Sequence, residues 1–194
     1  FRATASTDPL VSDPTASSEP MSQGLRDLRQ NRIADAIDHL EAAVTARPQS
    51  SEAHRILGLA YAAGDRHAEG LVQLETAVRL APDDERGRTG LGRAFIRQER
   101  WNEAERLLRT TIEVLPESAE ARWLLADLYE RRGLGPEAMR ELEAATAFPL
   151  LSGKGPLYWR LADLRHRHQQ FEAVPRALSQ RARLDPDNAT FHRD

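Results

Sequence analysis

Proline recurs at a fixed interval in the middle of this chain, at Pro48, Pro82 and Pro116, which are 34 residues apart. Each proline closes a stretch of helix-forming residues, in VTARPQSS, VRLAPDDE and IEVLPESA. Proline lacks a backbone N–H and its ring collides with the preceding turn, so an α-helix rarely continues through it. A helix stop that returns with a period of about 20 to 50 residues is typical of proteins built from stacked repeats.

Other residue classes keep the same phase as the prolines. The sequence divides into the units 17–50, 51–84, 85–118 and 119–152 and, after the insertion Gly153–Lys154, 155–188. A small residue recurs within the units at Gly24, Gly58, Gly92, Ala126 and Ala162. A leucine recurs at Leu40, Leu74, Leu108, Leu142 and Leu178, and the middle units share an aromatic position at Tyr61, Phe95 and Tyr129. This common register predicts one structural element pair repeated along the chain.

The pattern inside one unit predicts two helices joined by a turn. In the second unit, apolar residues are spaced by three and four over 56–61 and again over 71–78, as on one face of a helix. Gly64–Asp65 interrupts the pattern where a turn is needed. Helices of about a dozen residues are marginal alone, so we expect small residues such as Gly58 and Ala68 to let paired helices approach closely. The sequence therefore predicts an all-α fold of stacked hairpins.

The same residues resemble the tetratricopeptide repeat, whose signature places Leu-Gly, Tyr, Ala, an aromatic or Leu, Ala and Pro at fixed offsets. LGLAYAAGDRHAEGLVQLETAVRLAP (57–82) matches almost throughout, and residues 91–116 and 125–145 match well. The resemblance covers about residues 17–188. It implies an α-α superhelix, or solenoid, of helix-turn-helix repeats, and it says little about function because one scaffold serves many partners.

Several positions depart from the signature. Asp27 stands at the aromatic position of the first unit, so we expect its first helix to be short or to act as a cap. Pro149 comes one place early and joins the insertion, and Arg165 replaces the aromatic of the fifth unit. Pro175 falls inside the second helix of that unit and predicts a late start or a kink. Pro136, in contrast, occupies a first helical turn, where proline is tolerated.

The two ends differ from the repeats. Residues 1–20 are rich in Ser, Thr, Pro and Asp without helical periodicity, so we expect a disordered or extended linker. Residues 189–194 begin in the phase of a possible further repeat and stop early. This pattern favours a fragment or domain of a larger protein.

Family resemblance also indicates where a partner would bind. In tetratricopeptide repeats the first helix of each unit lines a concave groove that holds a peptide. By phase, the groove residues here are Arg55, Arg86, Arg93, Arg97, Trp123, Asp127, Glu130, Arg131, Trp159, Asp163, His166 and Arg167. Trp123 and Trp159 are in equivalent phase and are candidate anchors for apolar side chains. We expect the arginines to pair with acidic groups or a terminal carboxylate of the partner.

Two alternatives remain open for this groove. The tryptophans could pack against neighbouring helices, and the arginines could form solvated faces. Repeat proteins that clasp the carboxylate of heat-shock chaperones carry Lys and Asn at the groove positions held here by Met21 and Leu25. That pattern is absent, so a chaperone-tail adaptor is not indicated.

Composition and motifs exclude several other classes. The formal net charge of −3 argues against a nucleic-acid partner, and no apolar run is long enough to span a membrane. There is no cysteine, and His166 and His168 point away from each other on a helix, so no metal site is predicted. No phosphate-binding loop and no catalytic constellation is present, so neither a cofactor nor an enzyme activity is expected.

The sequence thus predicts a non-enzymatic scaffold or adaptor that binds another protein or peptide and helps to assemble a complex, of which it would be a subunit. The alternative is an accessory repeat region of a larger enzyme, regulator or secretion component. The Ser/Thr-rich start and the lack of cysteine suit a bacterial exported or periplasmic protein, although a cytoplasmic scaffold has the same composition.

Overall fold

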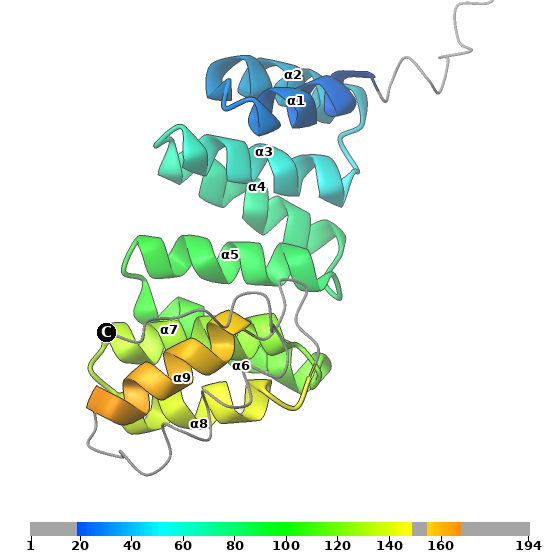
Figure 1. Cartoon of the computed structure of the whole chain (residues 1–194). Coiled ribbons are helices and arrows are strands. Elements are labelled where there is room, and N and C mark those ends of the chain that lie inside the picture. The colour runs from blue at the N-terminus through cyan, green and yellow to red at the C-terminus, as the bar shows by residue number, and fades with distance from the viewer. Residues whose placement is uncertain (1–18, 149–154, 168–194) are drawn as a thin grey trace, which may run out of the picture. The chain divides into compact units, whose positions relative to one another are not determined.

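A computed structural model describes residues 19–148 and 155–167 (Figure 1). Every regular element in these ranges is an α-helix, and consecutive helices form helix-turn-helix pairs. The helices are α1 (Glu19–Arg29), α2 (Ile33–Ala46), α3 (Ser51–Ala63), α4 (His67–Leu80), α5 (Glu85–Arg97), α6 (Trp101–Val114), α7 (Ala119–Arg131), α8 (Gly135–Ala145) and α9 (Gly155–Arg167). Within these ranges no helix is long and apolar enough to cross a membrane.

The chain divides into two compact units, residues 1–90 and 91–194, with the boundary inside α5. In the first unit α1 packs on α2, α2 on α3 and α3 on α4. In the second unit α6 packs on α7, α7 on α8 and α8 on α9. In both units the core is made of the buried leucines, alanines and aromatics of the repeat register.

Some expectations fall on parts of the chain outside the described residues. These are the segment 1–18, the Pro149 loop with the insertion, the second helix of the fifth repeat with Pro175, and residues 189–194. Glu19 and Pro20, at the end of the expected linker, lie in α1. Pro136 occupies the first turn of α8, as predicted.

The joints between repeats are built from short-range hydrogen bonds. Ser50 and Ser118 accept a bond from the backbone N–H three residues later, and Asp84 accepts from Arg86 and Gly87. These caps satisfy N–H groups that the first helical turn leaves without a partner. The residue six places after each joint proline also binds that proline's carbonyl, as His54 does at Pro48, Arg88 at Pro82 and Arg122 at Pro116.

The turn inside each helix pair contains one residue in the left-handed region. These residues are also 34 places apart, at Asn31 (φ 58°), Asp65 (59°), Glu99 (57°) and Gly133 (74°). Asn, Asp and Gly adopt this conformation more readily than other residues do, whereas Glu gains no local compensation. The turn geometry therefore persists although its residue changes.

Close approach of α3 and α4 depends on Gly58 and Gly70. A Cβ on Gly70 would lie 2.7 Å from the carbonyl oxygen of Gly58, which is too close for two atoms that are not bonded. Ala68, which we predicted from the sequence to take part in this contact, is exposed instead. The assignment was wrong because α4 begins at His67, so its first turn faces solvent and the second turn meets α3.

The aromatic position of the repeat is buried in each middle unit. Burial and a hydrogen bond to Glu41 raise the pKa of Tyr61 to about 12. In the first repeat Asp27 takes this place with only 1% of its side chain exposed. It is paired with Arg32 and lies 2.8 Å from His39 Nδ1, so the charge in the core is compensated.

Candidate partner-binding face

The predicted groove residues are divided between the two units. In the first unit, Arg55 lies half-buried on α3 within 3.8 Å of Glu52, and Arg86 is exposed near the start of α5. In the second unit, Arg93 and Arg97 follow on α5. The remaining predicted residues of this unit lie on α7 and α9, namely Trp123, Asp127, Glu130, Arg131, Trp159, Asp163, His166 and Arg167.

The structure brings α7 and α9 together through an ion network. Arg160 donates from Nη2 to Asp127 Oδ1 at 2.6 Å and from Nε to Glu130 Oε1 at 2.5 Å. Arg167 binds Asp163 at 2.6 Å and Glu130 at 3.3 Å, and Arg131 binds Asp127 at 2.9 Å. Because each of the two α7 carboxylates binds two guanidinium groups, these bonds form one continuous chain that runs from Arg131 to Asp163.

Arg160 is at the centre of this network. Its guanidinium lies over the ring of Trp123, with 5.3 Å between Cζ and the ring centroid. Burial disfavours the charge of Arg160, but hydrogen bonds to Asp127 and Glu130 outweigh it and raise the pKa of Arg160. A cation held over an indole by two carboxylates fixes both the side chain and the helix that carries it.

The two tryptophans have different environments. Trp123 is half-buried beneath Arg160, whereas Trp159 has 47% of its surface exposed and is one of three large apolar side chains so exposed among the described residues. Covering such an exposed indole would bury further apolar area. His166, another of the predicted groove residues, is exposed on α9.

On α5 the predicted arginines also differ from each other. Arg93 forms an ion pair with Glu120 of α7. Arg97 is exposed, and no ion pair joins it to any residue in the described ranges. Of the four arginines of the second unit that we expected to bind a ligand, Arg93, Arg131 and Arg167 therefore already form ion pairs within the chain.

Arg160 was missed by sequence reasoning, although the sequence contains a signal for it. Ile56 and Leu124 occupy the equivalent position in the second and fourth repeats, and both side chains are at most 5% exposed. A charged residue at an apolar phase of a helix indicates a compensating partner nearby. The identity of that partner required the tertiary structure.

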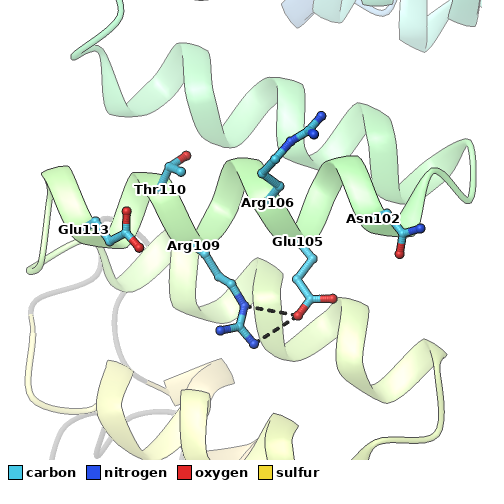
Figure 2. A pocket seen from close by; sticks show the side chains of 6 residues that line it. All are labelled: Asn102, Glu105, Arg106, Arg109, Thr110 and Glu113. Atoms are coloured by element: carbon cyan, nitrogen blue, oxygen red, sulfur yellow. Dashed lines mark hydrogen bonds and ion pairs between the residues drawn. The ribbon is translucent and has the colours of Figure 1, made fainter.

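An open depression of about 370 Å³ lies along one side of α6 (Figure 2). Asn102, Glu105, Arg106, Arg109, Thr110 and Glu113 line it. Arg109 binds both Glu105 and the hydroxyl of Tyr129, and burial together with Glu105 raises the pKa of that tyrosine. All of the residues that line it come from α6, and two of them, Glu105 and Arg109, bind Tyr129 of α7. Within the described residues no cluster of His, Asp or Glu could hold a metal ion.

Comparisons with known proteins agree with this architecture. The sequence profile of the tetratricopeptide repeat family matches residues 21–85 and 89–151. The chain therefore belongs to the tetratricopeptide repeat family, a class of all-α solenoids that generally act as protein-interaction scaffolds. No match was found in a search of curated protein sequences.

Similar solved structures carry the same fold. Residues 41 to the end of MamA from Desulfovibrio magneticus RS-1 superpose with a TM-score of 0.69 at 14% identity, over 90% of this chain and 97% of that one. PilF from Pseudomonas aeruginosa superposes with a TM-score of 0.75 at 18% identity, over 87% of this chain and 76% of that one. The matching chain of the APC/C hetero-tetramer Cut9–Hcn1 superposes with a TM-score of 0.73 at 16% identity, over 89% of this chain and 34% of that one. The predicted α-α superhelix fold class is confirmed by these matches.

Proposed function

We propose that this protein is a non-enzymatic scaffold that binds a segment of another protein on the face formed by α7 and α9. The observation that carries the proposal is the exposed Trp159 beside a continuous chain of ion pairs. Tryptophans in such surroundings are frequent energetic centres of protein interfaces, because burying them removes much apolar area from water at little entropic cost.

Two further observations support this function. Trp123 occurs at the same phase as Trp159, so the face offers indole surface on both first helices. The Cut9–Hcn1 match is an assembly of two different chains, which illustrates that this fold serves complex formation in at least one relative. An accessory role in a larger enzyme or secretion component is not favoured by either observation.

Site-specific cross-linking tests the proposal. A photo-crosslinking phenylalanine derivative at position 159 should capture a defined partner in a lysate of the source organism. The same derivative at position 140 is the matched control, because Arg140 is also well exposed but lies on α8. A partner captured equally from both positions, or from neither, would place binding elsewhere on the chain.

A further inference from the structure

The same row of side chains occurs on α7 and on α9. Every fourth residue of the row is Trp123, Asp127 and Arg131 on α7, and Trp159, Asp163 and Arg167 on α9. Residues four apart lie on one face of a helix, so each helix carries an indole, a carboxylate and a guanidinium in line. The aspartate binds the arginine of its own row, at 2.9 Å in α7 and at 2.6 Å in α9. The face of α7 and α9 therefore has an aromatic edge and a basic edge.

The arginines of the basic edge keep donors that the chain does not use. Arg131 binds Asp127 through Nε, and its two terminal nitrogens have no acceptor among the described residues. Arg167 binds both of its carboxylates through Nη2, which leaves Nε and Nη1 without an acceptor in the same ranges. Arg167 also reaches Glu130, the residue next to Arg131, so the two basic ends lie side by side.

Exposure decides which sign of charge a partner meets on this edge. The side chains of Arg131 and Arg167 are 54% and 53% exposed. The carboxylates that they bind are less exposed, at 16% for Asp127, 14% for Glu130 and 36% for Asp163. The charge that the basic edge presents to solvent is therefore mainly positive, although arginines and carboxylates are equal in number within the network.

The two edges are separated by a known length of helix. Trp159 and Arg167 are eight residues apart on α9, which at 1.5 Å per residue is about 12 Å along the axis. An extended peptide rises about 3.3 Å per residue, so about four of its residues span this distance. The Trp123 ring is covered on one side by Arg160, which leaves Trp159 as the more open indole. A segment that contacts both edges would carry an apolar and an acidic residue about four positions apart.

We infer that the face of α7 and α9 recognises an acidic peptide segment of its partner at two points. An aromatic or aliphatic side chain packs on Trp159, and acidic side chains about four positions away bind Arg131 and Arg167. The inference rests on the proposed function and specifies its ligand chemistry. Charge complementarity favours this occupant, because exposed guanidinium groups form charge-assisted bonds with carboxylates. Since Asp127 and Asp163 already hold these arginines, less conformational freedom is lost when a ligand binds.

Selection from a random peptide library displayed on phage tests the inference with the whole chain as bait. We expect the recovered peptides to combine an aromatic or aliphatic residue with Asp or Glu about four positions away. Replacing the acidic residues of a selected peptide by Asn or Gln leaves the protein unchanged and should weaken binding about tenfold. In the protein, Arg131→Gln and Arg167→Gln together should weaken binding of the original peptide about tenfold as well.

Arg140→Gln is the matched control, because Arg140 on α8 is 71% exposed and also binds one carboxylate of its own helix. Its affinity for the selected peptide should equal that of the wild type. Trp159→Ala should weaken binding about tenfold or more. Circular dichroism compares the helical content of the variants. If the double arginine variant loses helix, the substitutions in the peptide and the salt dependence decide the question on the wild-type protein.

Salt dependence provides a second, independent measure. Between about 0.05 M and 0.5 M NaCl, affinity for a selected peptide should fall about fivefold or more, because charge attraction is screened over this range. Peptides that require Trp159 but lack acidic residues at this spacing, or bind equally well at both salt concentrations, would overturn the inference and preserve the proposed function. Failure to recover any peptide that requires Trp159 would overturn both.

Discussion

At the scale of single residues, Asp27 illustrates how the repeat tolerates a foreign side chain at a core position. The aromatic phase of the register is otherwise held by Tyr61, Phe95 and Tyr129, all at most 7% exposed. A carboxylate there retains its charge because the hydrogen bond from Arg32 outweighs burial and, with His39, lowers the pKa of Asp27. The first repeat has thus exchanged apolar packing for an ion cluster.

Replacement of Asp27 by Asn should make the stability of the protein less dependent on pH. Because the pKa of Asp27 is lower in the folded chain than the ordinary value of 3.8, its charge stabilises the fold above that pH. This contribution is lost as the pH falls through the lower, folded value. Thermal unfolding followed by circular dichroism should therefore show wild type melting above Asp27→Asn at about pH 7, with the difference shrinking below about pH 4.

The matched control is Asp38→Asn, an exposed carboxylate on α2. Its melting temperature should stay close to that of the wild type at both pH values. Equal losses in the two variants would show that general surface charge, and not the buried cluster, sets the pH dependence.

Glu99 is a second residue whose conformation differs from its preference. Its φ of 57° lies in the left-handed region, which costs a residue with a Cβ roughly 1–2 kcal/mol. Glu99→Gly should raise the free energy of unfolding by roughly 0.5–1 kcal/mol, since glycine removes this strain but gains entropy when unfolded. Urea unfolding measures the change.

The reverse exchange is Gly133→Ala, at a φ of 74° with no atom within 4 Å of the added Cβ. It should cost roughly 1–2 kcal/mol for conformational reasons alone. If both variants unfolded at the wild-type urea concentration, the turns would not be strained as their φ angles indicate.

At the scale of helix pairs, the distance between α3 and α4 is limited by backbone atoms. Gly70→Ala should destabilise the protein by about 1–3 kcal/mol, because its Cβ would lie 2.7 Å from the carbonyl oxygen of Gly58, an atom that cannot rotate away. Gly90→Ala is the control, since its added Cβ meets only a terminal methyl of Leu74 at 3.3 Å. Similar urea midpoints for the two variants would mean that α3 and α4 can move apart without a loss in the free energy of unfolding.

Pairing of helices was largely predictable at this scale. The stops at Pro48, Pro82 and Pro116 and the caps at Ser50, Asp84 and Ser118 act within a few residues of sequence, so their pattern predicts where helices begin and end. The contact between Gly58 and Gly70 was only half predicted. Its second member depends on which turn of α4 faces α3, and this is a property of packing.

At the scale of the whole molecule, ion pairs join α9 to α7 in addition to the packing of α9 on α8. Arg160→Met should remove the two bonds to Asp127 and Glu130 and leave two neighbouring carboxylates without their shared cation. Amide hydrogen exchange in α9 should then become about tenfold faster, which corresponds to about 1.4 kcal/mol of local stability. Exchange in α3, in the other unit, should not change.

Arg140→Met is the control for this experiment, because it removes an arginine that is 71% exposed on α8. Exchange in α9 should match the wild type in this variant. Acceleration of similar size in both variants would assign the effect to the loss of any arginine and would contradict a specific role for the network.

The sequence by itself determined the family, the helix pairs and the phase of the proposed binding face, because proline stops, caps and hydrophobic spacing act locally and recur every 34 residues. Only the tertiary structure decided which charges on that face are satisfied. Arg160 meets its partners 30 and 33 residues away, across two helices, so their pairing depends on how the helices are packed. Repetition thus fixes the position of each side chain in its repeat, and packing between repeats decides which side chains remain open to a partner.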